Sequence, residues 1–329
     1  MQLNTLTRNS IGVVECDDLP LSLARETPQD TGLMRRVNDV LTARVIRFLK
    51  EQSKNHEEDF SKFTERFQLF IKEGILMEST GHGRKQDLAQ LLRFTSTTTE
   101  GNTQTSLSDY VKRMKDEQNV IHYLFAPDSE TAMHSPYIEA MKKSGEEVLF
   151  CYTAPDELCM RQLNEFEGKQ LRNVELTLAE PSDSDDAGEE YANISKEEAE
   201  KACTWVKETL GNKILNVAVS KRLVESPAML SGHMQSIDVK VLRAMGRGDS
   251  ATMGMSPTAG ATLEINLKHP LIISMIENHE IEEGKEIAQL VAEQILDNAL
   301  AAAGLLEDTS SGVERLNKLM LRALASTKT

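Results

Sequence analysis

Apolar positions in the first part of the chain recur every three or four residues, which predicts a packet of helices. Phe60, Phe63, Phe67 and Phe70 form an aromatic stripe along the second helical stretch, a pattern more typical of helix packing than of a ligand site. Gly74 is the predicted end of that stretch. The helices are expected at 31–53, 57–73 and 84–94, preceded by short strands at 11–14 and 19–23.

The hydrophobic period changes near residue 120, where short apolar runs alternate with helical stretches. This alternation predicts a βαβαβ unit, and therefore a parallel sheet with right-handed crossovers. Neither turn of the unit is rich in glycine, so it lacks the usual fingerprint of a nucleotide site. The strands are expected at 120–125, 148–152 and 171–178, and the helices at 129–143 and 155–166.

The acidic stretch 180–194 contains proline and glycine and predicts a linker between two domains. Ser195 and Glu198 have the spacing of a capping box, so a helix should begin there and end before Gly211. A strand at 228–230 is expected to pair with one at 214–219. Helices at 233–245 and 269–278 flank a further strand at 261–265. The predicted fold class is α/β in the middle of the chain and α+β overall.

The chain closes with two helical stretches, 284–303 and 312–326, each with a wide apolar face. A small domain cannot bury both faces, so we expect a two-fold, four-helix interface between two copies, with packing inside one chain as the alternative. The predicted interface residues are Ile287, Val291, Ile295, Ala299, Leu316, Met320 and Leu324.

Composition excludes several classes of function. A net charge of −15 without a basic stripe argues against nucleic-acid binding. No apolar run reaches the roughly 20 residues of a membrane helix, and the first ten residues show no targeting pattern. Cys16, Cys151, Cys159 and Cys203 lack metal-ligand spacing, so we expect reduced thiols and no metal. No common catalytic motif occurs, so on its chemistry alone the chain is not a complete enzyme.

Arg25 is a candidate anion-binding residue, because it lies in a turn directly after the predicted strand 19–23. A planar, permanently charged guanidinium suits a phosphate or a carboxylate arriving from outside. The alternative is a local ion pair with Glu26 or Asp30.

Several long segments together resemble the C-terminal half of the heat shock protein 90 family of chaperones. The resemblance covers the chain from about Gly12 to its end. The amino-acid sequence of residues 134–152 is most similar to the mitochondrial branch of the family. The segments that carry it are 13–29, 91–115, 119–124, 163–171, 219–228, 261–266 and the closing pair of helices.

The resemblance implies a division into domains. Residues 1–30 would be a remnant of the first middle subdomain, followed by a helical packet at 31–116 and a small α/β/α subdomain at 117–179. The acidic linker 180–194 would then lead to a dimerisation domain at 195–329.

The resemblance also implies roles for Arg25 and Gln29. In the family, these positions contact the γ-phosphate of ATP, which a separate N-terminal domain holds together with Mg. Ala24 and Pro28 depart from the usual pattern. Because this chain does not match that N-terminal domain, we expect no nucleotide bound and no ATP hydrolysis by this chain alone.

The family implies partly unfolded client proteins that bind to exposed apolar surface. Methionine is frequent in this chain, at 14 residues, and it makes adaptable apolar surface. The alternative is that the same side chains cover the dimer core. The candidate client-binding residues are Met229, Met234, Ile237, Val241, Met245, Met253 and Met255.

Two rival hypotheses accompany the chaperone interpretation: a dimerisation scaffold without client binding, and an enzyme that uses Arg25 for an anionic substrate. The chain closes with ALASTKT rather than an acidic pentapeptide, so helical-repeat co-chaperones are not expected as partners. A mitochondrial location is expected, with the cytoplasm as the alternative.

Overall fold

The computed structural model describes residues 32–78, 82–101, 103–178, 195–232, 234–246, 260–282, 284–306 and 310–326. The predicted strands at 11–14 and 19–23, and the acidic linker, lie outside these ranges. The chain divides into two compact units, one of residues 1–122, 149–151 and 155–172, the other of residues 123–148, 152–154 and 173–329. Each unit is built from several separate segments of the chain, so the units do not correspond to the expected domains. The domain limits expected at 116 and 179 stay predictions.

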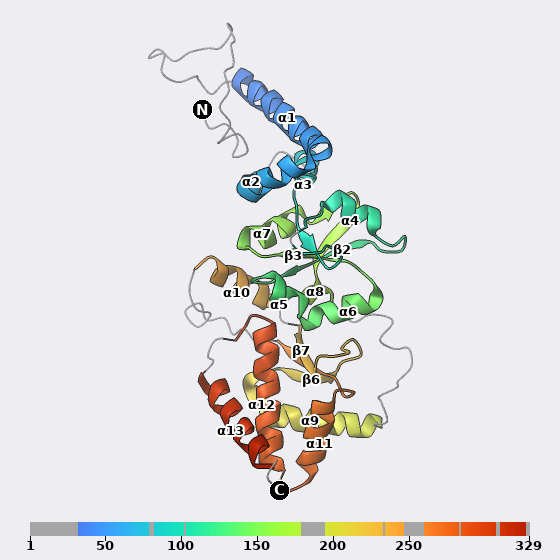
Figure 1. Ribbon diagram of the computed structural model, residues 1–329, viewed down its shortest axis with the longest axis vertical. Helices are drawn as coiled ribbons and strands as arrows, with labels where there is room; N and C mark the ends of the chain where they lie inside the picture. The colour runs from blue at the N-terminus through green and yellow to red at the C-terminus, as the bar shows by residue number, and fades with distance from the viewer. Residues whose placement is uncertain are drawn as a thin grey trace. The chain divides into compact units, whose positions relative to one another are not determined.

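The first unit contains the helical packet that the apolar period predicts (Figure 1). The helices are α1 (Gly32–Asn55), α2 (Glu57–Met77), α3 (His82–Ala89) and α4 (Leu107–Arg113). The prediction that Gly74 ends the second helix is wrong, because α2 continues for three more residues and buries Gly74 and Ile75 in its last turn. Burial of this turn outweighs the modest cost of glycine inside a helix.

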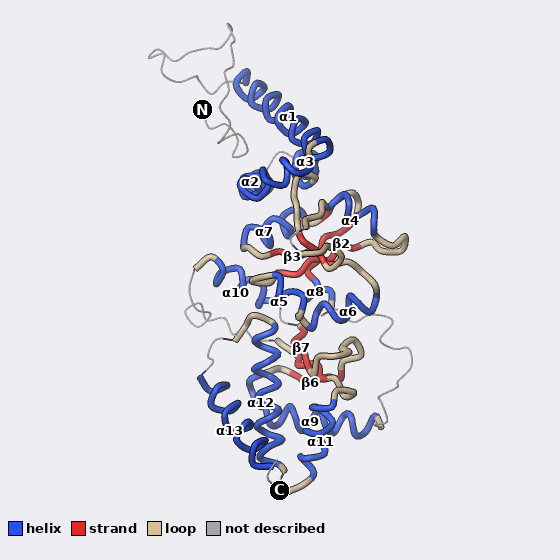
Figure 2. Tube along the Cα trace, in the orientation of Figure 1, coloured by secondary structure: helices blue, strands red, loops and turns tan. Residues whose placement is uncertain are grey.

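The middle of the chain forms a five-stranded sheet in the order β1-β3-β2-β5-β4. Its strands are β1 (Thr95–Ser96), β2 (Val120–Phe125), β3 (Val148–Cys151), β4 (Glu165–Phe166) and β5 (Lys169–Asn173). The sheet is mixed, because two strands outside the predicted βαβαβ unit, β1 and β4, pair antiparallel with β3 and β5. Figure 2 shows the strands gathered in two separate groups.

The hairpin between β4 and β5 explains part of this difference. Glu167 and Gly168 both have positive φ, 48° and 77°, as a tight two-residue hairpin turn requires. The predicted helix 155–166 therefore stops earlier, as α7 (Ala154–Leu163), and Glu165 and Phe166 join the sheet. The predicted strand 171–178 is also too long, because its second half forms the short helix α8 (Val174–Thr177).

The predicted helix 129–143 is two helices, α5 (Ser129–Met133) and α6 (Pro136–Ser144). Pro136 is the first residue of α6, where a missing amide hydrogen costs nothing, but it cannot continue the preceding helix. Gly145 then ends α6 in the left-handed conformation, at φ 67°.

The C-terminal part begins with α9 (Lys196–Leu210), whose predicted capping box is confirmed: Ser195 and Glu198 exchange side-chain and backbone hydrogen bonds. A short 3₁₀ helix (Gly211–Lys213) leads to a three-stranded sheet. Its strands are β6 (Asn216–Val219), β7 (Ala228–Ser231) and β8 (Thr262–Ile265), in the order β6-β8-β7. The expected pairing of β7 with β6 is wrong, because β8 lies between them, parallel to β6 and antiparallel to β7.

Four more helices complete this part: α10 (Met234–Ala244), α11 (Pro270–Glu280), α12 (Lys285–Ala302) and α13 (Ser310–Ser326). Helix α12 packs on α9, α11 and β7, and α13 lies along α12 (Figure 1). The buried core between the sheet and these helices is apolar and includes Leu230, Leu263, Ile265, Ile272 and Leu296. Burial of this kind supplies most of the stability of such a domain.

Candidate functional site

The residues predicted to contact nucleotide, Arg25 and Gln29, lie outside the described part of the chain. The surfaces formed by the C-terminal helices are therefore the candidate functional features. Among the described residues, no group of three or more His, Cys, Asp or Glu side chains is placed to hold a metal ion. No described helix has both the length and the apolar character needed to cross a membrane.

Helix α13 carries an exposed apolar stripe. Val313, Leu316, Met320 and Leu324 follow one another at intervals of three and four residues, so they share one face of the helix. Their exposed fractions are 54%, 45%, 48% and 66%. Neighbouring apolar side chains that stay exposed along one helix are typical of a surface that a partner covers.

The opposite face of α13 is tied to α12 by charged groups. Arg315 is buried, its Nε lies 2.9 Å from Glu293 Oε2, and it also pairs with Asp297. About two turns further along, Arg322 pairs with Glu286. These ion pairs hold the helix in an orientation in which the described part of the chain leaves the apolar stripe exposed.

The predicted interface residues on α12 behave differently from those on α13. Ile295 and Ala299 are buried in the core of their own chain, at 2% and 3% exposed, and Val291 packs against that core. Ile287 is half-buried. For Ile295 and Ala299, the structure thus favours packing inside one chain, whereas the α13 members of the predicted set are exposed.

The candidate client-binding residues are not brought together on one exposed surface. Met229 is completely buried in β7 and Val241 is 5% exposed on α10, so neither is accessible in this conformation. Met245, just after α10, is 48% exposed. Met234 and Ile237 belong to α10, but their side chains lie outside the description, as do Met253 and Met255 altogether.

A cavity of about 360 Å³ lies beside α10 within the second unit. Phe125, Tyr152 and Ala301 belong to a mainly apolar lining, whose charged residues are Glu175, Lys240 and Arg243. Lys240 Nζ lies 2.5 Å from Glu175 Oε1, and their side chains are only 9% and 2% exposed. Sequence reasoning missed this pair, because the two residues lie on different elements far apart in the chain.

A second hollow, of about 460 Å³, lies between α1 and α2 in the first unit. The predicted aromatic stripe lines it: Phe60 is buried, and Phe63, Phe67 and Phe70 are half-buried, with neighbouring rings 5.2 to 6.4 Å apart. Phe48 of α1 faces the same hollow and is 56% exposed. The stripe thus packs partly within the helical packet, as its spacing predicts.

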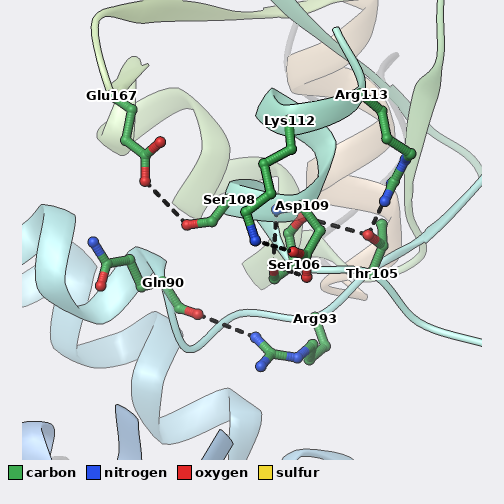
Figure 3. Close-up of polar contacts among 9 residues, drawn as sticks. All are labelled: Gln90, Arg93, Thr105, Ser106, Ser108, Asp109, Lys112, Arg113 and Glu167. Atoms are coloured by element: carbon green, nitrogen blue, oxygen red, sulfur yellow. Dashed lines mark hydrogen bonds and ion pairs between the residues drawn. The ribbon is translucent and has the colours of Figure 1, made fainter. Parts of the chain in front are cut away.

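The segment 91–115, which carries much of the family resemblance, forms a polar network at the start of α4 (Figure 3). Ser106 caps the helix by accepting a hydrogen bond from the Asp109 amide at 3.0 Å, and its hydroxyl donates to the Asp109 carboxylate at 2.7 Å. Lys112 Nζ lies 2.7 Å from Asp109 Oδ1, and Arg113 donates to Thr105 Oγ1 at 2.8 Å. Each of these groups has a partner in the network. The network therefore fixes the loop before α4.

Electrostatics in this network follow from its hydrogen bonds and from burial. Hydrogen bonds from Lys112 and Ser106 lower the pKa of Asp109, which stays ionised. Arg93 is held over the ring of Phe60, with its guanidinium carbon 4.8 Å from the ring centroid, and burial lowers its pKa. Nothing in this arrangement points to a reacting group, so we assign it a structural role.

Comparison with known proteins accords with the resemblance. A family model described as "Hsp90 protein" matches residues 10–329. The chain is 39% identical over 320 residues to "Heat shock protein 75 kDa, mitochondrial" of Rattus norvegicus, an alignment that covers 95% of this chain and 44% of the relative. It is 36% identical over 313 residues to "Chaperone protein HtpG" of Desulfitobacterium hafniense, which covers 95% of this chain and 49% of the relative.

A third relative, "TNF receptor-associated protein 1 homolog, mitochondrial" of Dictyostelium discoideum, is 32% identical over 312 residues, covering 94% of this chain and 42% of that protein. The chain thus spans slightly less than half the length of these three curated relatives.

Proposed function

Since this chain belongs to the Hsp90 family of chaperones, we propose that it forms a homodimer through α13 and holds non-native proteins on apolar surface near α10. The observation that carries the proposal is the exposed stripe of Val313, Leu316, Met320 and Leu324. An isologous pairing of α13 with its copy would cover this stripe on both chains at once.

The client surface is proposed from Met245 and the methionines around α10. Met245 is the member of the predicted set whose side chain is described and exposed. A flexible thioether adapts to irregular apolar partners, as binding of many different clients would require. Met229 and Val241 are buried, so they do not belong to the proposed surface in this conformation.

Arg25 and Gln29 are proposed to act on the γ-phosphate of ATP when a nucleotide domain of the family kind is present with its Mg. A guanidinium aimed at the phosphate would stabilise the negative charge that develops during hydrolysis. This chain alone is proposed to be inactive as an ATPase, because the family's nucleotide is held by a different domain.

We propose a mitochondrial location, because two of the relatives carry that word in their names. The resemblance to the bacterial protein HtpG keeps the cytoplasm as the second candidate. A tagged copy of the chain, followed by cell fractionation, would separate the two.

Light scattering of a heat-unfolding client, with and without an equal concentration of this chain and without nucleotide, tests the proposal. We expect the chain to suppress aggregation and the variant Met245→Ser to suppress it less, because an exposed apolar anchor is lost. Glu208→Ser, an exposed change on α9, serves as the control.

The second candidate, a dimerisation scaffold, predicts a different result in the same assay. A chain that is dimeric by sedimentation but leaves client aggregation unchanged would contradict client binding and favour the scaffold.

A further inference from the structure

The cavity beside α10 is built from parts of the second unit that are distant in the chain. Its volume of about 360 Å³ lies in the range of small-molecule sites, roughly 300–1,000 Å³. The residues after β2, the C-terminal half of α10 and the end of α12 contribute to its walls. Leu124, Phe125 and Ala303 of these walls are buried. The walls therefore belong to the packed interior, and the site is formed before a ligand binds.

One polar side chain in the lining is available to a ligand. Ser135 is 6% exposed and directly precedes the first turn of α6. Its hydroxyl makes no capping hydrogen bond to α6 and has no other hydrogen-bond partner within the described ranges of the chain. A buried hydroxyl without a partner is costly, so a ligand oxygen that accepts its hydrogen would be stabilised there.

The charge around the cavity favours an anion. Two cations, Lys240 and Arg243, and one carboxylate, Glu175, belong to the lining, which leaves one positive charge in excess. The ion pair of Lys240 with Glu175 lies inside the lining and does not change this excess. Arg243 Nη1 donates to the carbonyl of Gly304 at 3.2 Å, which holds the guanidinium at the cavity. Ser135 adds the positive end of the dipole of α6, a helix of nine residues.

The rest of the lining is mainly apolar. Phe125, Pro127 and Ala302 present carbon surface without a side-chain donor or acceptor. Such surface favours an aliphatic chain, because the chain is removed from water when it binds. A ligand with one anionic end and one apolar chain matches both parts of the lining, whereas a compact inorganic anion matches only the charged part.

We propose that this cavity binds a carboxylic acid with a single aliphatic chain, such as a medium-chain fatty acid. The carboxylate would accept a hydrogen bond from Ser135 and be attracted by Arg243, and the chain would contact the apolar walls. This inference goes beyond the proposed chaperone function and does not depend on it.

Isothermal titration calorimetry of the full chain with decanoate, below its micelle concentration, tests the proposal. Decylammonium has the same aliphatic chain and the opposite charge, so it is the matched probe. We expect decanoate to bind at least about tenfold more tightly than decylammonium, and this preference to shrink as salt is added. Equal affinities for the two probes would overturn the proposal, as would a failure of decanoate to bind.

Two variants test the site of the carboxylate. Ser135→Ala removes the hydroxyl, and Arg243→Met removes the excess charge while it keeps an apolar stem. We expect each to weaken decanoate binding about fivefold or more, and Arg243→Met to leave decylammonium binding no weaker. Lys143→Met, an exposed change on α6 outside the lining, is the control. An equal loss of both probes in Arg243→Met would contradict the assignment, because it would indicate a change of structure.

A third variant tests the cavity itself. Ala301 is exposed and belongs to the lining, so Ala301→Phe should fill part of the space without disturbing the core. We expect it to weaken decanoate binding about tenfold or more. Ala43→Phe, at an equally exposed alanine on α1, should leave binding unchanged. Wild-type affinity in Ala301→Phe would mean that decanoate binds elsewhere, and would reject the site.

Anionic phospholipids also combine negative charge with acyl chains. Flotation of the chain with phosphatidylglycerol vesicles separates a lipid from a free acid. We expect no flotation that depends on the cavity, because the acyl chains of a phospholipid would have to leave the bilayer to enter it. Flotation that Ala301→Phe abolishes would overturn the free acid as the ligand in favour of a lipid.

Discussion

At the residue scale, Glu139 shows how one carboxylate organises a turn. Its Oε2 accepts hydrogen bonds from the backbone amides of Val224, Glu225 and Ser226 at 2.9, 3.0 and 3.2 Å, and its Oε1 accepts one from the Ser226 hydroxyl. Asn266 donates to the carbonyls of the same turn. The turn before β7 is thus held from both sides by side chains.

The pKa of Glu139 follows from this arrangement. Burial by itself would raise the pKa, but the hydrogen bonds from Ser226 and the three amides outweigh burial and lower it. A carboxyl with a lowered pKa stabilises the fold above its ordinary pKa of 4.5, and that stabilisation is lost as the pH falls through the folded-state pKa.

Glu139→Ala should therefore lower the free energy of unfolding near neutral pH, by about 1 kcal/mol since the carboxylate is partly exposed. The difference from wild type should shrink as the pH falls below 4.5. Urea unfolding at a series of pH values measures both effects, with Glu208→Ala on α9 as the control. A difference that stays constant across this range would contradict the assignment.

At the element scale, α12 and α13 differ, although their similar apolar patterns predict that both belong to a dimer interface. Helix α12 turns Ile295, Leu296 and Ala299 into the core of its own chain. Helix α13 is attached through Arg315 and leaves its apolar stripe exposed. One helix thus belongs to the domain core, and the other presents a surface.

Leu316→Ser combined with Met320→Ser should weaken the proposed dimer at least about tenfold, because both side chains would lie at the centre of the stripe. Sedimentation over a range of concentrations measures the dissociation constant. Leu69→Ser, an equally exposed leucine on α2 at 47%, should leave it unchanged. A wild-type chain that stays monomeric at all concentrations would reject the α13 interface.

At the scale of the whole molecule, the chain spans slightly less than half of the three relatives compared above. The proposed ATP chemistry needs a nucleotide held by a domain that this chain does not match. Arg25 would then contribute to an ATP site whose other residues belong to the domain that holds the nucleotide.

We expect the purified chain to hydrolyse ATP no faster than its Arg25→Ala variant, which a phosphate-release assay measures. Turnover that disappears in Arg25→Ala would contradict the chaperone proposal and favour an enzyme with an anionic substrate. Unchanged suppression of client aggregation by the same variant would show that client binding does not require Arg25.

Local patterns were sufficient to predict much of the fold. Helices α1, α2 and α3, the capping box at Ser195 and the two closing helices follow from spacing and end signals that act within a few residues. The family was also evident from the sequence, because the matching segments are long and occur in order. The order of the strands could not be predicted in the same way. Strand β8 lies between β6 and β7, and this position depends on long-range contacts that no local pattern encodes.

The sequence by itself determined which residues share a helix face, and therefore that α10, α12 and α13 are amphipathic. Only the tertiary structure decided what covers each face: Ile295 and Val241 are buried, whereas Leu316 and Met245 are exposed. The physical reason is that a period of 3.6 residues defines a direction on a helix but not its neighbour. Burial depends on long-range packing, as does the pairing of Lys240 with Glu175 across 65 residues.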